Sequence, residues 1–218
     1  MKTAVITGAS RGIGYHLAVK MAETKTAERF VLAARTVSGN SSLKDALGKY
    51  GCEFILVDAD LATREGVEKV FAAARDKGWK VDILVNNAGR GIYKPIAEES
   101  YDTISQIINL NVTGLIYLTA LFAGDLIERR GTVVNIASVA GRKGIGGLSV
   151  YCATKWAVVG FSESIRDELF SKKVRIITVE PGLVDTDWGE ELPESFIQYK
   201  QSVEMLKPEQ VAETILFA

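Results

Sequence analysis

Short runs rich in β-branched and aliphatic residues recur along the whole chain, and they constrain its fold more than any other feature. Six of them stand out: Thr3–Thr7, Phe30–Ala34, Glu53–Asp58, Asp82–Asn86, Thr132–Ser138 and Val174–Gly182. Continuous apolar runs of this length are typical of strands buried on both faces, as in a parallel sheet. The stretches between them are long enough to hold the helical crossovers that parallel strands require. The pattern therefore predicts an α/β fold with a doubly wound parallel sheet and helices on both faces.

The stretches between these runs carry helical periodicity. Between Thr63 and Gly78, the apolar residues fall on one stripe of a helix, namely Val67, Val70, Phe71 and Ala74, and Gly78 is a stop signal. The chain of 218 residues contains no linker, repeat or low-complexity segment. We therefore expect a single domain over residues 1–218.

Two predicted helices are apolar on more than one face. They are the segment from Thr103 to Ile127 and the helix after Tyr151, which carries Trp156, Val158, Val159 and Phe161. A helix that is apolar on most faces must be covered on most faces. This predicts a homodimer or homotetramer; the alternative is that both are central core helices.

Composition excludes several classes of protein. The formal net charge is −1, so neither a nucleic acid nor an anionic membrane is expected as a partner. The first apolar run meets Gly8 too early for a signal peptide, and no run approaches about 18 consecutive apolar residues, so a cytoplasmic protein is expected. The only cysteines, Cys52 and Cys152, form no C-x-x-C pair; free thiols and no metal site are predicted.

A glycine-rich turn follows the first predicted strand. The segment "TGASRGIG", from Thr7 to Gly14, places Gly8, Gly12 and Gly14 directly before a helix. Glycines permit a tight turn and let a pyrophosphate approach the N–H groups at a helix N-terminus. The turn predicts a dinucleotide site; the alternative is a plain tight turn.

The end of the second predicted strand bears on the choice of cofactor. An Asp or Glu there binds the ribose of NAD, whereas an arginine accommodates the 2′-phosphate of NADP. This chain has Ala34 and then Arg35 with no carboxylate, and Arg11 adds a second cation from the glycine turn. Together the two guanidinium groups predict NADP(H), although each arginine alone could be a surface residue.

Tyr151 and Lys155 are four residues apart and would share one helix face. This spacing alone could be a coincidence, but it joins six other motifs in one order: "TGASRGIG", "DADLA", "NNAG", "NVTG", "NIAS" and "PGLVDT". With these motifs the chain resembles the short-chain dehydrogenase/reductase family over Thr3 to about Thr186. The resemblance implies a Rossmann-like fold and an oxidoreductase that acts on CH–OH or C=O groups.

The resemblance also implies the site. The catalytic residues would be Asn111, Ser138, Tyr151 and Lys155. The cofactor would contact Gly8, Ser10, Arg11, Gly12, Ile13, Gly14, Arg35, Asp60, Leu61, Asn87, Ala88, Gly89, Tyr151, Lys155, Pro181, Gly182, Val184 and Thr186. Asp60 could instead cap the next helix, and the "NNAG" amides could mainly tie strands together. A substrate lid is expected at about residues 187–206, where Trp188, Phe196 and Tyr199 could equally be packing residues.

The residue types suggest a mechanism. A carbonyl that accepts a hydride needs a proton donor, and a free tyrosine has a pKa of about 10. A lysine charge about 4 Å away is worth ~4 kcal/mol at an effective dielectric of about 20. We therefore expect Lys155 to lower the pKa of Tyr151 by up to ~3 units. By resemblance, Ser138 would hold the substrate oxygen, Lys155 the nicotinamide ribose, and Asn111 a water that relays protons.

The expected function is NADPH-dependent reduction of a small-molecule ketone or aldehyde. An NADP-linked alcohol dehydrogenase that works oxidatively is one alternative. A non-catalytic NADP-binding regulator on the same fold is another, because a fold does not fix a function.

Overall fold

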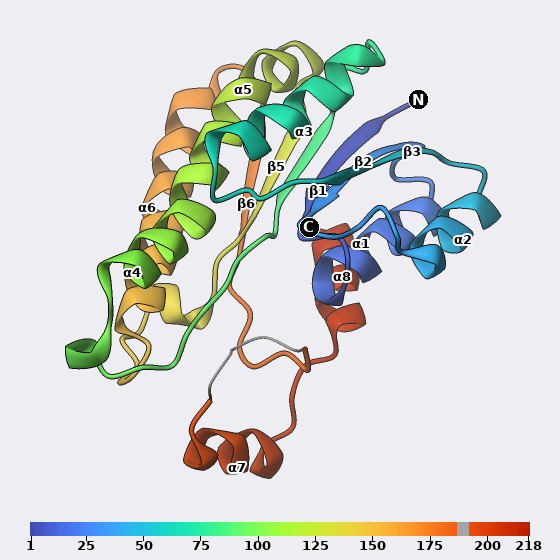
Figure 1. Cartoon of the computed structure of the whole chain (residues 1–218). Helices are drawn as coiled ribbons and strands as arrows, with labels where there is room; N and C mark the ends of the chain where they lie inside the picture. The colour runs from blue at the N-terminus through green and yellow to red at the C-terminus, as the bar shows by residue number, and fades with distance from the viewer. Residues whose placement is uncertain (187–191) are drawn as a thin grey trace.

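The computed structural model describes residues 1–186 and 192–218, and its centre is a six-stranded parallel sheet (Figure 1). The strand order is β3-β2-β1-β4-β5-β6. The strands are β1 (Thr3–Thr7), β2 (Arg29–Ala34), β3 (Glu53–Asp58), β4 (Ile83–Asn86), β5 (Thr132–Ile136) and β6 (Arg175–Val179). All of the pairings are parallel, as the apolar runs predict.

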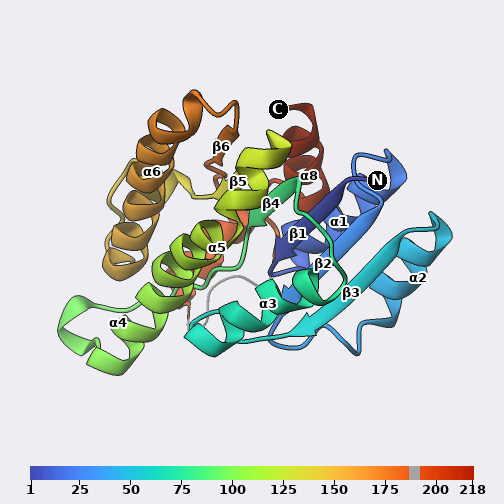
Figure 2. The same ribbon diagram turned by 90° about the horizontal axis from the view of Figure 1, so that it is seen from above.

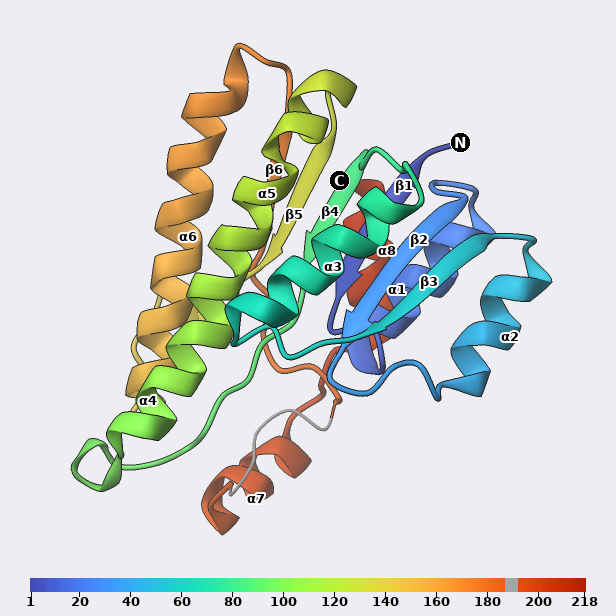
Figure 3. The same cartoon turned by 45° about the horizontal axis from the view of Figure 1, so that its top comes forward.

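Helices cover both faces of the sheet (Figures 1 and 2). One face carries α1 (Gly12–Glu23), α2 (Ser41–Lys49) and α8 (Pro208–Phe217). The other carries α3 (Arg64–Asp76), α4 (Tyr101–Ile108), α5 (Gly114–Arg129) and α6 (Ser149–Phe170). The short helix α7 (Glu194–Ser202) lies beyond the edge of the sheet at which the strands end (Figures 1 and 3). The fold class expected from the sequence is confirmed.

The two faces of the sheet bury alternate residues of the same strands. Along β2, Phe30 and Leu32 pack into the core beneath α1 and α8, whereas Val31 and Ala33 pack beneath α3 and α5. All four side chains are fully buried. Burying a large aliphatic or aromatic side chain contributes about 1.5–3 kcal/mol, so both faces of β2 favour apolar residues. This explains why the strands appear as uninterrupted apolar runs.

Two strands end earlier than their apolar runs. β5 stops at Ile136, because Ser138 caps a 3₁₀ turn, η3 (Val139–Gly141), by accepting a hydrogen bond from the Ala140 N–H at 3.1 Å. β6 stops at Val179, two residues before Pro181, which has no N–H to donate to a ladder. The runs to Ser138 and Gly182 thus each contain a strand followed by a loop that faces the site.

The predicted helix from Thr103 to Ile127 is not one regular α-helix. It is α4, then a π-helical turn η2 (Asn109–Thr113), then α5. The whole stretch Tyr101–Arg129 has a mean hydropathy of 1.6 over its most apolar window, enough for a membrane span by length and composition. This differs from the expectation that no stretch approaches a span. A core helix meets the same criterion, and Leu118, Phe122 and Leu126 of α5 are buried against the sheet.

Candidate active site

The predicted site residues gather at the carboxyl ends of the strands, where ligands bind in open α/β sheets. The chain reverses its direction of strand addition between β1 and β4, so the loops after these two strands diverge and leave a crevice. The glycine turn leaves β1 at this point and leads into α1. The crevice therefore lies beside the predicted phosphate-binding turn.

The three glycine positions of the turn have little or no room for side chains. Gly8 and Gly12 have φ of +66° and +57°, which favour glycine. A Cβ on Gly14 would lie 2.5 Å from the Gly8 carbonyl oxygen, so the start of α1 presses directly on the turn. A Cβ on Gly12 would lie 3.3 Å from Cγ2 of Thr186, which places the loop after β6 beside the loop after β1.

The side chain of Asn87 holds β1 and β4 together. Its Nδ2 donates to the carbonyl oxygens of Thr7 at 2.8 Å and Gly8 at 3.2 Å. The Thr7 hydroxyl accepts from the N–H groups of Asn87 at 2.9 Å and Ala88 at 3.0 Å. An architectural role for the "NNAG" amides is therefore supported, while the backbone from Ala88 to Gly89 borders the crevice. Thr7 is a site-shaping residue that the sequence interpretation missed.

The loop after β2 is anchored by Asp58 at the end of β3. Its carboxylate accepts from the hydroxyl of Ser38 and from the N–H groups of Ser38 at 2.8 Å and Val37 at 2.6 Å. These hydrogen bonds, led by the Ser38 hydroxyl, lower the pKa of Asp58 to about 2. Arg35 is exposed just before this anchored loop, and Arg11 is exposed at the N-cap of α1. Both predicted cations thus lie on the solvent side of the crevice.

Asp60 does not cap α3. The N-cap of α3 is Thr63, whose hydroxyl accepts from the Gly66 N–H at 3.0 Å. The Asp60 carboxylate instead accepts from the Ala62 N–H at 3.0 Å and remains exposed after β3, whereas Leu61 is buried. The alternative role of Asp60 as the cap of α3 is therefore wrong.

Ser138, Tyr151 and Lys155 come together between β5 and the first turns of α6. Tyr151 is 7% exposed and Lys155 is 5% exposed. The Lys155 ammonium lies 5.7 Å from the centroid of the Tyr151 ring and donates to the carbonyl oxygen of Ile136 at 2.7 Å. The last carbonyl of β5 therefore fixes the lysine, a contact that sequence reasoning could not identify because it uses a backbone atom.

Burial sets the protonation of this pair. Desolvation raises the pKa of Tyr151 to about 12, although a hydrogen bond with Ser138 opposes the rise. Desolvation also lowers the pKa of Lys155 to about 8. Lys155 thus becomes neutral before Tyr151 can ionise, so it supplies no fixed charge at the pH where the tyrosine titrates. The expected lowering of the pKa of Tyr151 by ~3 units is therefore wrong for the protein alone, because burial raises this pKa and Lys155 is not among the groups that lower it.

Asn111 lies in the π-helical turn η2 and is 1% exposed. Its Nδ2 donates to the carbonyl oxygen of Arg90 at 2.8 Å and to the Thr154 hydroxyl at 3.0 Å, and its Oδ1 accepts from the Arg90 N–H at 2.9 Å. Its side chain thus joins the loop after β4 to α6. Single-turn π-helices are frequent at functional sites. Thr154 and the Arg90 backbone are partners that the motifs did not reveal.

The loop after β6 completes the crevice. It contains Pro181, Gly182, Val184 and Thr186. Val184 forms a β-bridge with Leu206, so the two ends of the intervening segment lie side by side. Of the predicted lid, residues 187–191, including Trp188, lie outside the described residues, whereas Phe196 and Tyr199 lie on α7.

The residues present fit a dinucleotide. The glycines let the turn after β1 pack directly on the loop after β4, where a Cβ on Gly8 would lie 2.7 Å from Asn87 Nδ2. At the other end of the crevice, a Cβ on Gly89 would lie 3.4 Å from Asn111 Oδ1 and 3.5 Å from Lys155 Nζ. Gly89 therefore brings the backbone of the loop after β4 directly beside the catalytic groups.

Known proteins resemble this chain in sequence. The family model described as short chain dehydrogenase matches residues 2–195. The chain is 32% identical, over 225 residues, to the NADP-dependent 3-hydroxy acid dehydrogenase of Schizosaccharomyces pombe, with 100% of this chain and 86% of the relative covered. It is 32% identical over 218 residues to the 3-oxoacyl-[acyl-carrier-protein] reductase of a Synechocystis species, with 99% and 88% covered.

Solved structures share the whole fold. An alcohol dehydrogenase from the archaeon Thermococcus sibiricus, complexed with 5-hydroxy-NADP, matches with a TM-score of 0.84 and 28% identity, covering 99% of this chain and 88% of that chain. The bulky-bulky ketone specific alcohol dehydrogenase from Comamonas testosteroni also has a TM-score of 0.84 and 28% identity, covering 100% and 82%.

Proposed function

This chain belongs to the short-chain dehydrogenase family, and from that premise we propose that it is an NADPH-dependent reductase of ketones or aldehydes. The observation that carries the proposal is a buried tyrosine, Tyr151, kept protonated beside Ser138 and Lys155. A tyrosine with a pKa of about 12 holds its proton at neutral pH. It can therefore donate a proton to a carbonyl oxygen in reduction, and the same residue would accept that proton in alcohol oxidation. The relatives named as reductases support the reductive direction.

In the proposed reaction, NADPH supplies the hydride that reduces the carbonyl carbon. The Ser138 hydroxyl holds the carbonyl oxygen, and the Tyr151 hydroxyl gives that oxygen its proton. Lys155, with a pKa of about 8, is mostly protonated at pH 7 and stabilises the phenolate left behind. Preorganised donors of this kind stabilise the charge that develops on oxygen.

The main role of Asn111 would be to hold neighbouring segments of the site in place. Both of its Nδ2 hydrogens are used, by the Arg90 carbonyl and the Thr154 hydroxyl. A water that relays protons to Lys155 would therefore have to use the second lone pair of Oδ1 or the main chain. We propose that the amide holds the loop after β4 against α6, so that the cofactor and the catalytic residues keep their spacing.

The cofactor would lie along the crevice. The glycine turn would hold its pyrophosphate, Asp60 and Leu61 its adenine, and the backbone from Asn87 to Gly89 its adenosine ribose. Arg11 and Arg35 would hold the 2′-phosphate, which NADH lacks. The name of the Schizosaccharomyces pombe relative and the 5-hydroxy-NADP in the archaeal structure support this choice.

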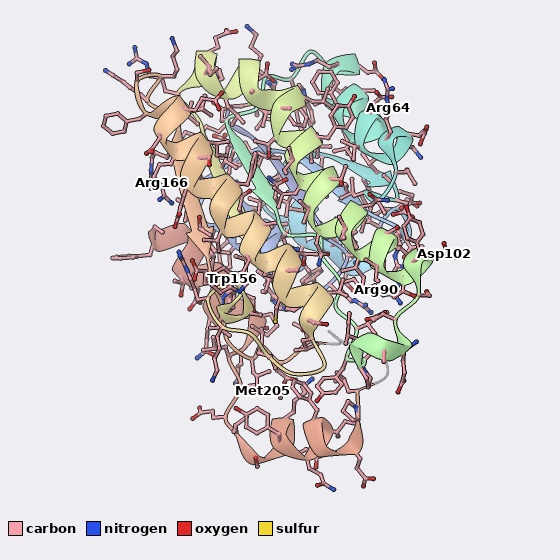
Figure 4. The ribbon with its side chains drawn as sticks, turned by 90° about the vertical axis from the view of Figure 1, so that its left-hand side faces the viewer. Arg64, Arg90, Asp102, Trp156, Arg166 and Met205 are labelled. Atoms are coloured by element: carbon pink, nitrogen blue, oxygen red, sulfur yellow. The ribbon has the colours of Figure 1, made fainter. Side chains whose placement is uncertain are left out.

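A homo-oligomer is part of the proposal. The surface of α4, η2, α5 and α6 exposes Ile108 (40%), Ile116 (36%) and Trp156 (54%). In Figure 4, α5 and α6 run side by side, and Trp156 lies on the side of α6 away from α5. A second copy covering this face would bury these apolar side chains and so stabilise the catalytic helix.

We expect the protein to work in the cytoplasm.

The test is NADPH consumption with a panel of aldehydes, ketones, diketones and 3-oxoacyl thioesters. The control is Tyr151→Phe, which keeps the ring and its packing but removes the proton donor. Turnover should fall about 10²-fold or more, the usual scale for losing a general acid, while NADPH affinity stays within about twofold. A Tyr151→Phe enzyme with near-normal turnover would refute the proposed role of the tyrosine.

A further inference from the structure

The two cations expected at the 2′-phosphate lie on different segments of the chain. Arg11 follows Ser10 in the glycine turn after β1, and Arg35 begins the loop after β2. The helices that these two segments enter, α1 and α2, lie on the same face of the sheet (Figure 2). Two guanidinium groups can bind one phosphate together only if the segments that carry them keep a fixed spacing. The contacts between these segments therefore bear on the choice between NADP(H) and NAD(H).

A backbone and a side-chain hydrogen bond join the two segments. The Ala9 N–H donates to the Ala33 carbonyl oxygen at 3.2 Å, where the segments leave the sheet. Farther along, Asn40 Nδ2 donates to the Ser10 carbonyl oxygen at 2.9 Å, across 30 residues of sequence. The side-chain contact thus ties the far end of the loop after β2 to the peptide bond that precedes Arg11.

The Asn40 side chain also caps α2. Its Oδ1 accepts from the Leu43 N–H at 3.0 Å, and its backbone N–H donates to the Val37 carbonyl oxygen at 3.0 Å. Val37 is fully buried, and its own N–H donates to the Asp58 carboxylate at 2.6 Å. Asn40 is therefore held by α2 on one side and by an anchored loop on the other. Its Nδ2 donor consequently keeps the Ser10 carbonyl in a defined position.

The residue type at position 40 fits both contacts. Ser, Thr, Asp, Asn and Gly are the preferred N-caps, and of these only Asn carries an acceptor and a separate N–H donor. A serine at this position could cap α2, but it would have a single oxygen atom on a shorter side chain. Capping alone therefore does not require asparagine, whereas a simultaneous contact with the glycine turn does.

The contact acts on the peptide bond that enters Arg11. Because a peptide unit is planar, holding the Ser10 carbonyl fixes the plane that contains the Arg11 N–H. Arg11 is the N-cap of α1, with φ of −161° and ψ of 177°, and its side chain makes no capping hydrogen bond there. The direction in which the Arg11 side chain leaves the turn thus depends on the peptide plane that Asn40 holds.

We propose that Asn40 is a positioning residue for the 2′-phosphate of NADP(H): it holds the glycine turn against the loop after β2, so that Arg11 and Arg35 reach the same phosphate. The inference rests on the proposed roles of the two arginines and adds the residue that sets their spacing. Because NAD(H) has no 2′-phosphate, loss of this spacing weakens NADP(H) binding more than NAD(H) binding. A residue that only stabilised α2 would affect both nucleotides alike.

The experiment measures the affinities of NADP⁺ and NAD⁺ by calorimetry, which needs no carbonyl substrate. Asn40→Ser keeps an N-cap for α2 and loses the contact with Ser10, whereas Asn40→Ala loses both. In both variants the ratio of NADP⁺ affinity to NAD⁺ affinity should fall about fivefold, the scale of one net hydrogen bond. The Tm should fall more in Asn40→Ala, because only this variant loses the cap.

Two further variants separate positioning from helix capping. Ser100→Ala removes the N-cap of another helix, α4, where the hydroxyl accepts from the Thr103 N–H at 3.2 Å, and it should leave the affinity ratio unchanged. In an Arg11→Ala background, Asn40→Ser should have little further effect on the ratio, because the guanidinium that it places is gone.

Two results would overturn the proposal. One is an affinity ratio within twofold of wild type in both Asn40 variants, and the other is an undiminished effect of Asn40→Ser in the absence of Arg11. A wild type that binds NAD⁺ as tightly as NADP⁺ is a different failure, since it would contradict the assigned roles of Arg11 and Arg35 themselves.

Discussion

Replacing the buried Lys155 with methionine should make the cofactor-free protein more stable at pH 7. The pKa of Lys155 falls to about 8 from its ordinary 10.5, which at about 1.36 kcal/mol per pH unit corresponds to about 3 kcal/mol of unfavourable burial. Lys155→Met keeps the unbranched apolar stem but leaves the Ile136 carbonyl without its 2.7 Å donor, which costs about 1–2 kcal/mol. The net gain should be about 1–2 kcal/mol, or roughly 2–8 °C in Tm for a chain of this size.

The pH dependence of the stability difference shows whether the burial of the Lys155 ammonium causes it. The folded-state pKa of Lys155 lies below its unfolded value, so between about pH 8 and 10.5 the unfolded chain binds more protons, and the stability of the wild type rises with pH. Lys155→Met lacks this rise. Its advantage should shrink by about 2 kcal/mol between pH 7 and pH 9.5.

Urea unfolding of both proteins at pH 7 and pH 9.5, without nucleotide, measures these differences. Tyr151, whose raised pKa makes the folded state lose stability mainly between pH 10 and 12, is present in both proteins and lies outside this window. A mutant that is less stable at pH 7, with a difference that does not change with pH, would refute the reasoning. Such a result would mean that the ammonium is not appreciably destabilised by burial.

Three further predictions concern the cofactor and the assembly. Arg35→Asp should reverse the preference in kcat/KM from NADPH to NADH, because a carboxylate repels the 2′-phosphate; an unchanged preference would count against the cation argument. Gly14→Ala, whose Cβ would lie 2.5 Å from the Gly8 carbonyl oxygen, should weaken NADPH binding at least tenfold, whereas Gly48→Ala, with open space around it, should not. Trp156→Asp should shift sedimentation toward the monomer and lower activity with it; an oligomer that stays intact would exclude this face as the interface.

The sheet could be predicted from the sequence almost completely, whereas the electrostatics of the site could not. The alternating burial of Phe30, Val31, Leu32 and Ala33 leaves a continuous apolar run, which a parallel sheet produces and few other folds do. The motifs also placed Ser138, Tyr151 and Lys155 at one edge, because the carboxyl ends of parallel strands coincide. The four-residue spacing of Tyr151 and Lys155 led us to expect a lowered pKa for the tyrosine, but its pKa is raised. The cause is burial, which depends on packing by elements that are distant in the sequence.

Contacts made by main-chain atoms in the site also could not be predicted from the sequence. The carbonyl of Ile136 holds Lys155, and both main-chain groups of Arg90 hold Asn111. Neither contact depends on the residue type of its backbone partner, so no sequence motif can encode it. Thr7 and Thr154, whose hydroxyls complete the same connections, are common residues in unremarkable positions.

The π-helical turn at Asn109–Thr113 shifts the phase of the apolar pattern between α4 and α5. A π-turn accommodates one more residue than an α-turn, and one residue corresponds to a rotation of about 100° around the helix axis. The inward-facing stripe of α5 is therefore out of phase with that of α4, and a regular helical wheel drawn through both spreads the apolar residues over two faces. The phase shift thus explains part of the spread of apolar residues over two faces of this segment. Deleting a single residue within the turn would restore one continuous stripe, but it would rotate Asn111 away from the loop after β4.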